Sequence, residues 1–203
     1  MAMKRLLLTA SAVLLTCSCI TIRLAGRSSE QTVHSLECPD PPPAPPAVSD
    51  IRVRDFSCST EYDRTGMVLV DSSGLVTRTS THRWASSPGI SLSDLLARHL
   101  LAEGSFDAVL RRSVMTGTGA IVEGHVAEFG ARQIDGVWHA VIDTDLILSD
   151  ARSRELISQK RIRLSSPMPS TGFDSLAAVM STLASRWSGE ARAFIHDALE
   201  GFE

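Results

Sequence analysis

Two stretches in the middle of the chain, AIVEGHVAEF at residues 120–129 and WHAVIDTDLIL at residues 138–148, decide the fold. In both, apolar residues recur at every second position, with polar or charged residues between them. This alternation is typical of antiparallel strands that bury one face and expose the other to water. The first stretch places Val122, Gly124 and Val126 on one face. The sequence therefore predicts two neighbouring strands that share a core face.

Weaker signals of the same kind predict further strands on both sides of this pair. They cover residues 51–53, 67–70, 75–79, 106–110 and 156–164. Asp71-Ser72-Ser73-Gly74 is a turn signal that joins two of these strands in a hairpin. Pro167 and Pro169 end the last strand, because proline cannot donate a hydrogen bond to a neighbouring strand.

Apolar residues at intervals of three and four predict two amphipathic helices. The first begins at Ser91, which with Asp94 resembles a capping box, and ends at Gly104. The second follows Thr171 and ends at Gly201, and its roughly 26 residues give a length near 40 Å. The order of elements predicts an α+β fold. We expect a largely antiparallel or mixed β-sheet with two helices packed on one face, the C-terminal helix long.

The N-terminus has the pattern of a secretory signal peptide. A short basic segment precedes the ten-residue apolar run Leu6–Leu15, which is shorter than the roughly 20 residues of a transmembrane helix. LTCSC at residues 15–19 then resembles the bacterial lipobox, in which a small residue precedes the cysteine that is acylated. Residues 1–18 are thus predicted to be a lipoprotein signal peptide and Cys19 the lipid attachment site. The alternative is an ordinary signal peptide with incidental cysteines.

Acyl chains on Cys19 would anchor the protein to a membrane, since each buried methylene contributes about 0.8 kcal/mol. Ile20, rather than an acidic residue, follows Cys19. By resemblance to bacterial lipoprotein sorting, this favours the outer membrane, with the rest of the chain facing the periplasm.

Residues 19–49 are predicted to be the lipidated N-terminus and a proline-rich tether. Six prolines fall within residues 39–46, and such a run favours the extended polyproline II conformation. A ligand for a proline-recognition module is the alternative, although such modules are scarce outside the cytoplasm. Residues 50–203 remain for one folded domain, which is within the usual size of about 100–200 residues.

Two cysteines lie outside the lipobox, Cys38 in the tether and Cys58 in the domain. In an oxidising compartment they can form a disulfide, which would contribute roughly 3 kcal/mol by closing a loop of about 20 residues. Two free buried thiols are the alternative. No metal site is predicted from them, because a lone pair of cysteines lacks the clustered ligands that zinc needs.

Composition and motifs argue against enzymes and nucleic-acid binders. The net charge of −3 is unlike the basic face of a nucleic-acid-binding protein. Thr116-Gly117-Thr118-Gly119 superficially resembles a phosphate loop but lacks the lysine that such a loop requires. The sequence contains neither a nucleophile elbow nor a zinc-protease motif. We therefore predict no catalytic residue, no cofactor and no metal.

One polar cluster leaves an alternative open. Glu123 and His125 on the first central strand would face His139, Asp143 and Asp145 on the second if the two strands pair. Imidazoles and carboxylates on one face can form a metal or acid–base site. A solvated sheet face of mixed charge explains the same pattern and is our interpretation. An envelope hydrolase that uses His125 and Asp143 is the alternative.

Several short motifs carry a resemblance to a known family. The hairpin is followed by Arg83-Trp84-Ala85 and a helix, the first central strand ends in Val126-Ala127-Glu128-Phe129, and the C-terminal helix contains Leu183 and Trp187. Over residues 49–200 this arrangement resembles the ABC-type transport auxiliary lipoproteins, which include the paraquat-inducible protein C type. The segment around Cys58 and a longer loop at residues 86–90 depart from the family pattern.

The resemblance implies a non-enzymatic component of a lipid-transport system that faces the periplasm. In such systems an ABC ATPase and permease act with a protein of the MCE (mammalian cell entry) type, which bridges the envelope. The auxiliary lipoprotein would be an adaptor that docks this bridge to the outer membrane. The alternative is a carrier domain that binds phospholipid in an apolar groove between helix and sheet. A homo-oligomer is compatible with either role.

Overall fold

The computed structural model describes residues 30–46, 50–112 and 119–201. The predicted signal peptide and Cys19 lie outside these described residues, as do Thr116, Gly117 and Thr118 of the glycine-bearing loop. The strands are β1 (Thr32–His34), β2 (Asp50–Val53), β3 (Ser57–Cys58), β4 (Gly66–Val70), β5 (Val76–Trp84), β6 (Ala108–Arg111), β7 (Ala120–Ile134), β8 (Val137–Asp150) and β9 (Leu156–Pro167). The helices are α1 (Pro88–Glu103) and α2 (Phe173–Glu200).

β7 is the central strand of one mixed sheet. β8 pairs with it in antiparallel orientation over the full length of both strands, and β9 pairs in the same way with β8. Along the opposite edge of β7, the short strands β2, β3 and β4 pair with it in succession, all parallel. β6 extends the sheet beyond β2, whereas β5 and β1 extend it beyond β4.

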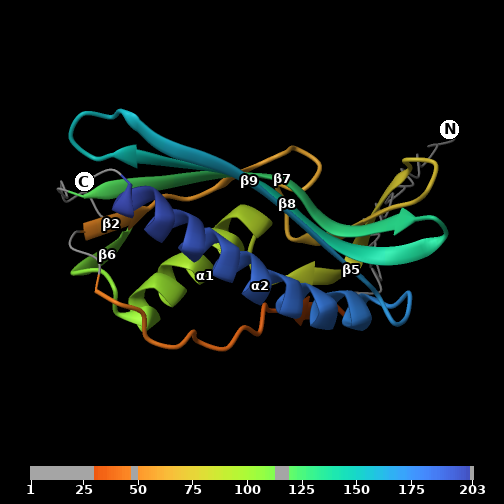
Figure 1. Ribbon diagram of the computed structural model, residues 1–203. Helices are drawn as coiled ribbons and strands as arrows, with labels where there is room; N and C mark the ends of the chain where they lie inside the picture. Colours follow the sequence, from red (N-terminus) through yellow and green to blue (C-terminus); the bar gives the residue numbers. More distant parts are fainter. Residues whose placement is uncertain (1–29, 47–49, 113–118, 202–203) are drawn as a thin grey trace, which may run out of the picture.

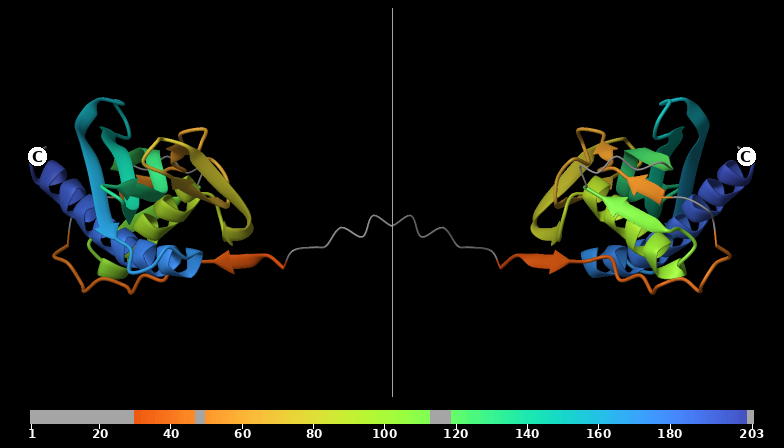
Figure 2. Two further views of the ribbon diagram at one scale, coloured as in Figure 1. Left: turned by 90° about the vertical axis from the view of Figure 1, so that its right-hand side faces the viewer. Right: turned by 90° about the vertical axis from the view of Figure 1, so that its left-hand side faces the viewer.

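Both helices lie on the same face of this sheet (Figure 1). α2 runs along β8 and β9, and α1 packs beside it, so that two layers are seen again from either end of the molecule (Figure 2). The core-facing residues of β8 are the ones that the alternation predicts, and Ala140, Ile142 and Leu148 are completely buried. These findings confirm the predicted α+β fold. Within the described residues, no helix has the length and hydropathy needed to span a bilayer.

The helix ends are predicted better than the helix starts. Gly104 ends α1 in the left-handed conformation with φ 69°, which glycine adopts without strain. α1 begins at Pro88 rather than at Ser91, so the predicted loop at residues 86–90 is mostly the first helical turn. Proline is well suited to this position, because its fixed φ is helical and the first amide needs no acceptor. α2 begins after Gly172, and no side chain caps it.

The described part of the predicted tether, residues 30–46, is packed against the domain; we call it the N-terminal strap. β1 of the strap pairs with β5, and Cys38 is buried. The strap then runs along the helix layer, where the Ala44 amide donates to the Glu103 carbonyl at the end of α1 (2.9 Å). The structure therefore corrects the interpretation of this segment as a free spacer. A proline run has the same extended conformation whether it is solvated or packed, so the sequence pattern does not separate the two.

Candidate functional site

The polar cluster predicted on the two central strands is divided by the register of β7 and β8. His125 lies opposite Asp145, whereas His139 lies opposite Arg132 near the other end of the ladder. The two ring nitrogens of His125 contact the hydroxyls of Ser57 (2.9 Å) and Ser59 (3.2 Å). Because both nitrogens are occupied by serines, neither is left for the orienting carboxylate of a hydrolase triad. The single acid–base cluster that the alternation suggested does not form.

Asp143 is part of a separate ion-pair network that a β-bulge creates. The register of β7 shifts between Val126 and Glu128, which places Glu128 opposite Asp143. Arg161 binds Asp143 through two hydrogen bonds of 2.9 and 2.7 Å. Arg132 donates to Glu128 at 2.5 Å. Both carboxylates are thus buried and paired with arginines, so this part of the face is not solvated as the sequence suggested, and neither carboxylate is free to act as an acid or base.

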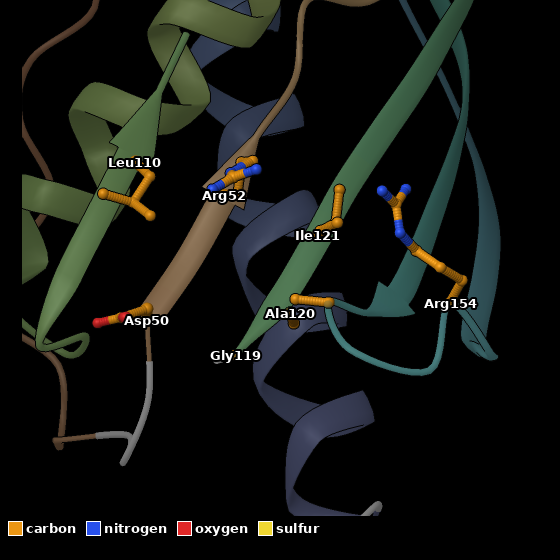
Figure 3. A pocket seen from close by; sticks show the side chains of 8 residues that line it. Asp50, Arg52, Leu110, Gly119, Ala120, Ile121 and Arg154 are labelled. Carbon is orange, nitrogen blue, oxygen red and sulfur yellow. The ribbon is translucent and has the colours of Figure 1, made fainter. Parts of the chain in front are cut away.

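A different feature stands out at the end of the sheet where β2 begins. A small pocket of about 70 Å³ lies among β6, β2, β7 and the turn between β8 and β9 (Figure 3). It is lined by Asp50, Arg52, Leu110, Gly119, Ala120, Ile121, Ala151 and Arg154. Ile51 and Val53 are completely buried in the core, so the alternation of β2 directs Arg52 to the face without helices. We call this feature the arginine pocket.

Arg52 is the unusual side chain of the arginine pocket. Its Nε and Nη2 atoms are buried and, among the described residues, have no hydrogen-bond partner. Its neighbours differ: Arg54 is paired with Glu123 (2.7 Å) and Arg111 with Asp55 (2.6 Å). Arg52 as a whole is half-buried, but two buried nitrogens without an acceptor are unfavourable. An anionic group in the pocket would supply the acceptors that these two nitrogens lack among the described residues.

A second arginine reaches the same pocket from a structured turn. Arg154 has a left-handed backbone with φ 64°, and its amide donates to the Asp150 carbonyl (3.1 Å). The Asp150 carboxylate accepts hydrogen bonds from the amides of Arg152 and Ser153, which also lowers the pKa of Asp150. This turn fixes the position from which the Arg154 side chain extends toward β7 (Figure 3).

The chemistry of the arginine pocket is that of anion binding. Two guanidinium groups offer planar pairs of donors suited to a phosphate or carboxylate. The volume is far below the roughly 300–1,000 Å³ of a pocket for a drug-sized ligand, so the pocket fits one anionic group. Neither Arg52 nor Arg154 stands out in the sequence. The signal available was an arginine between two core residues of a strand, which looks the same on a solvated face.

The two cysteines outside the lipobox are free thiols in the structure. Cys38 donates to the Ser181 carbonyl on α2 (3.3 Å), and Cys58 accepts a hydrogen bond from the Gly89 amide at the start of α1 (3.1 Å). Each sulfur thus has its own hydrogen-bond partner, and the structure contains no bond between Cys38 and Cys58. Burial raises the pKa of both thiols, which keeps them protonated and poorly reactive. Elsewhere, His34, His82 and Asp174 form the one group among the described residues that could hold a metal ion.

Comparison with known proteins finds a matching family model and solved structures of similar fold. A family model described as the ABC-type transport auxiliary lipoprotein component matches residues 34–191. The crystal structure of protein XCC0632 from Xanthomonas campestris is similar at 16% identity and TM-score 0.76, over 84% of this chain and 98% of that one. Hypothetical protein CT253 from Chlamydia trachomatis is similar at 12% identity and TM-score 0.51, over 75% of this chain and 98% of that one. The comparison with curated proteins gave no match.

Proposed function

Because the chain belongs to the family of ABC-type transport auxiliary lipoproteins, we propose that it is a lipid-anchored adaptor of an ABC transport system. In this proposal the domain faces the periplasm and docks an MCE-type transport bridge to the outer membrane. The lipid anchor is Cys19, which follows the signal peptide.

The observation that carries the adaptor role is the packing between helices and sheet. Trp187 of α2 is completely buried, stacks edge-on against Phe56 and donates to the Thr144 hydroxyl of β8 at 2.8 Å. Trp84 packs edge-on against Phe129 in the same layer. Large side chains occupy the space in which a carrier would hold acyl chains. This packing favours binding of a partner on the outer surface of the domain rather than binding of lipid in an internal groove.

β9 offers such a binding surface. Among the described residues it pairs only with β8, so one side of this 12-residue strand has unpaired backbone groups. An exposed edge can accept a strand from a partner protein. Leu156 at the start of β9 is 58% exposed and gives the edge an apolar contact. Charged residues such as Lys160 on the same strand limit non-specific pairing.

Affinity capture of the full-length lipoprotein from its own membranes tests the adaptor role. The MCE protein and the permease should co-purify with the wild type, and Leu156→Asp should reduce their yield several-fold. Leu75→Asp is the matched control, because Leu75 is similarly exposed (64%) in the β4–β5 turn. Recovery of no MCE or ABC component with the wild type, after crosslinking, would contradict the proposal.

The anchor is tested separately by mass spectrometry of the mature N-terminus. We expect residues 1–18 to be absent and Cys19 to carry acyl chains, with the protein in the outer-membrane fraction. Cys19→Ala should release the protein from that fraction. An unmodified Cys19, or a wild-type protein in the inner-membrane fraction, would contradict this part of the proposal.

The arginine pocket favours a second candidate function, recognition of an anionic lipid headgroup. The supporting observation is that the buried Nε and Nη2 atoms of Arg52 have no hydrogen-bond partner within residues 30–46, 50–112 and 119–201. Native mass spectrometry with phosphatidylglycerol should give a 1:1 complex with the wild type, and Arg52→Gln should weaken it at least tenfold. Arg78→Gln, at an exposed position of β5, is the control. Equal binding by Arg52→Gln and the wild type would exclude the pocket as the headgroup site.

A further inference from the structure

Three side chains from distant parts of the chain meet where the N-terminal strap joins the sheet. His34 is the last residue of β1, His82 lies on the neighbouring β5, and Asp174 lies in the first turn of α2. His34 Nε2 is 3.2 Å from His82 Nδ1 and 3.8 Å from Asp174 Oδ1. The three ligand atoms all lie within 4.8 Å of one another.

The two separations from His34 Nε2 are close to those of a zinc site. Tetrahedral Zn²⁺ with bonds of about 2.0–2.1 Å to nitrogen and oxygen places its ligand atoms roughly 3.3 Å apart. The 3.2 Å contact between the imidazoles already has this length, and the 3.8 Å contact needs only a small rotation of Asp174. The Asp174 side chain is 87% exposed and is free to make that adjustment.

Aromatic neighbours hold the two imidazole rings in place. His82 stacks on Phe173 with ring centroids 4.7 Å apart, and His34 meets the edge of Trp84 at 6.5 Å. The His34 side chain is only 12% exposed. In the hydrogen bond between the imidazoles, one nitrogen carries the proton and the other offers a lone pair. If the protons occupy the outer nitrogens instead, both lone pairs face the gap between the rings, and a modest tilt of each ring makes them converge on a metal.

We propose that His34, His82 and Asp174 form a binding site for a divalent transition metal, best suited to Zn²⁺, with water completing the coordination. The metal joins the N-terminal strap to β5 and α2. β1 is only three residues long, so a metal bond to its last residue adds substantially to what holds it on the sheet. The strap follows the proposed anchor, Cys19, in the chain. The metal would therefore strengthen the attachment of the anchor-bearing segment to the folded domain.

The full mature chain, freed of metal with a chelator and carrying no histidine tag, is titrated with Zn²⁺ by calorimetry. We expect one Zn²⁺ per chain, and at least a tenfold weaker affinity for His82→Gln and Asp174→Asn. Asp174→Asn removes an exposed carboxylate and is therefore unlike a core mutation. His139→Gln is the control, because the one hydrogen bond of the His139 ring among the described residues is to the Val137 carbonyl.

Two further measurements locate the metal. Co²⁺ in place of Zn²⁺ should give the intense visible bands of a tetrahedral site without a thiolate charge-transfer band. Zn²⁺ at about ten times its Kd should slow hydrogen exchange of the β1 amides about tenfold. The proposal is overturned if the wild type binds no Zn²⁺, if Asp174→Asn and His82→Gln bind as tightly as the wild type, or if cobalt spectra show cysteine ligands.

Discussion

At the scale of single residues, Glu103 shows how a buried charge is retained. Its side chain, at the end of α1, is completely buried and is bound by Arg192, by His196 (2.9 Å) and by Ser105 (2.7 Å). Burial by itself raises the pKa of this carboxyl, but the hydrogen bonds from Arg192, Ser105 and His196 outweigh it and lower the pKa. Glu103 thereby joins α1 to α2 as a carboxylate.

Replacing Glu103 should lower stability in a pH-dependent way. A carboxyl whose pKa is lower in the folded state stabilises the fold above its unfolded pKa of about 4.3, and this stabilisation is lost as the pH falls through the folded value. We expect Glu103→Gln to lower the free energy of unfolding by about 3 kcal/mol at pH 7. The difference from the wild type should shrink below about pH 4.

Urea unfolding of both proteins between pH 3 and pH 8 measures this effect. Glu190→Gln is a suitable control, because Glu190 is an exposed residue of α2. A difference that does not change with pH would show that the carboxylate charge of Glu103 contributes nothing to its role.

At the scale of elements, α2 is attached to the sheet by its tryptophan. The Trp187 indole donates to the Thr144 hydroxyl, and both side chains are completely buried. Thr144 is a polar residue in the core-facing row of β8, in which the neighbouring residues Ile142 and Leu146 are apolar. The threonine hydroxyl accepts the hydrogen bond of the indole N–H, since a buried donor needs a partner.

Removing that partner should weaken the contact between helix and sheet. Thr144→Val keeps the shape but leaves the indole N–H without an acceptor, so we expect a loss of about 1–3 kcal/mol in the free energy of unfolding. Thr182→Val on the exposed side of α2 should change it by less than about 0.5 kcal/mol. Chemical denaturation measures both. Equal effects of the two substitutions would mean that the Trp187 bond is replaced by another partner.

At the scale of the whole molecule, the N-terminal strap belongs with the domain. Cys38 is buried against α2, and the Glu37 amide donates to the Ser181 hydroxyl (3.1 Å). Arg98 of α1 donates to the Cys38 carbonyl at 2.9 Å. The strap thus contacts both helices, in addition to the pairing of β1 with the sheet.

Truncated chains can distinguish a strap that is packed on the domain from a tether that is free of it. A chain that begins at residue 30 should be about as stable as the mature chain. A chain that begins at residue 47 loses the strap and should unfold about 5–10 °C lower, since about 2–3 kcal/mol of packing is removed. Thermal unfolding followed by circular dichroism measures the difference. Equal melting temperatures for the two truncated chains would show that the strap does not stabilise the domain and is a spacer.

The sequence alone determined the local structure of this protein. The alternation in β7 and β8, the turn between β4 and β5 and the three- and four-residue spacing in α2 all predicted their elements correctly. These signals are local, because each strand or helix buries one face whatever its partner is. The resemblance to the family rested on the same elements, with Trp84 and Trp187 among them. The family match confirmed it.

Only the tertiary structure decided which residues meet. The bulge in β7 put Glu128 beside Asp143, and the register separated His125 from His139. The arginine pocket and the histidine pair at β1 draw on elements that are far apart in the chain. Strand pairing and helix packing, which no local pattern records, determine such contacts. The packing of the proline-rich strap along both helices is also a long-range contact, so the local sequence pattern, which indicated a spacer, does not reveal it.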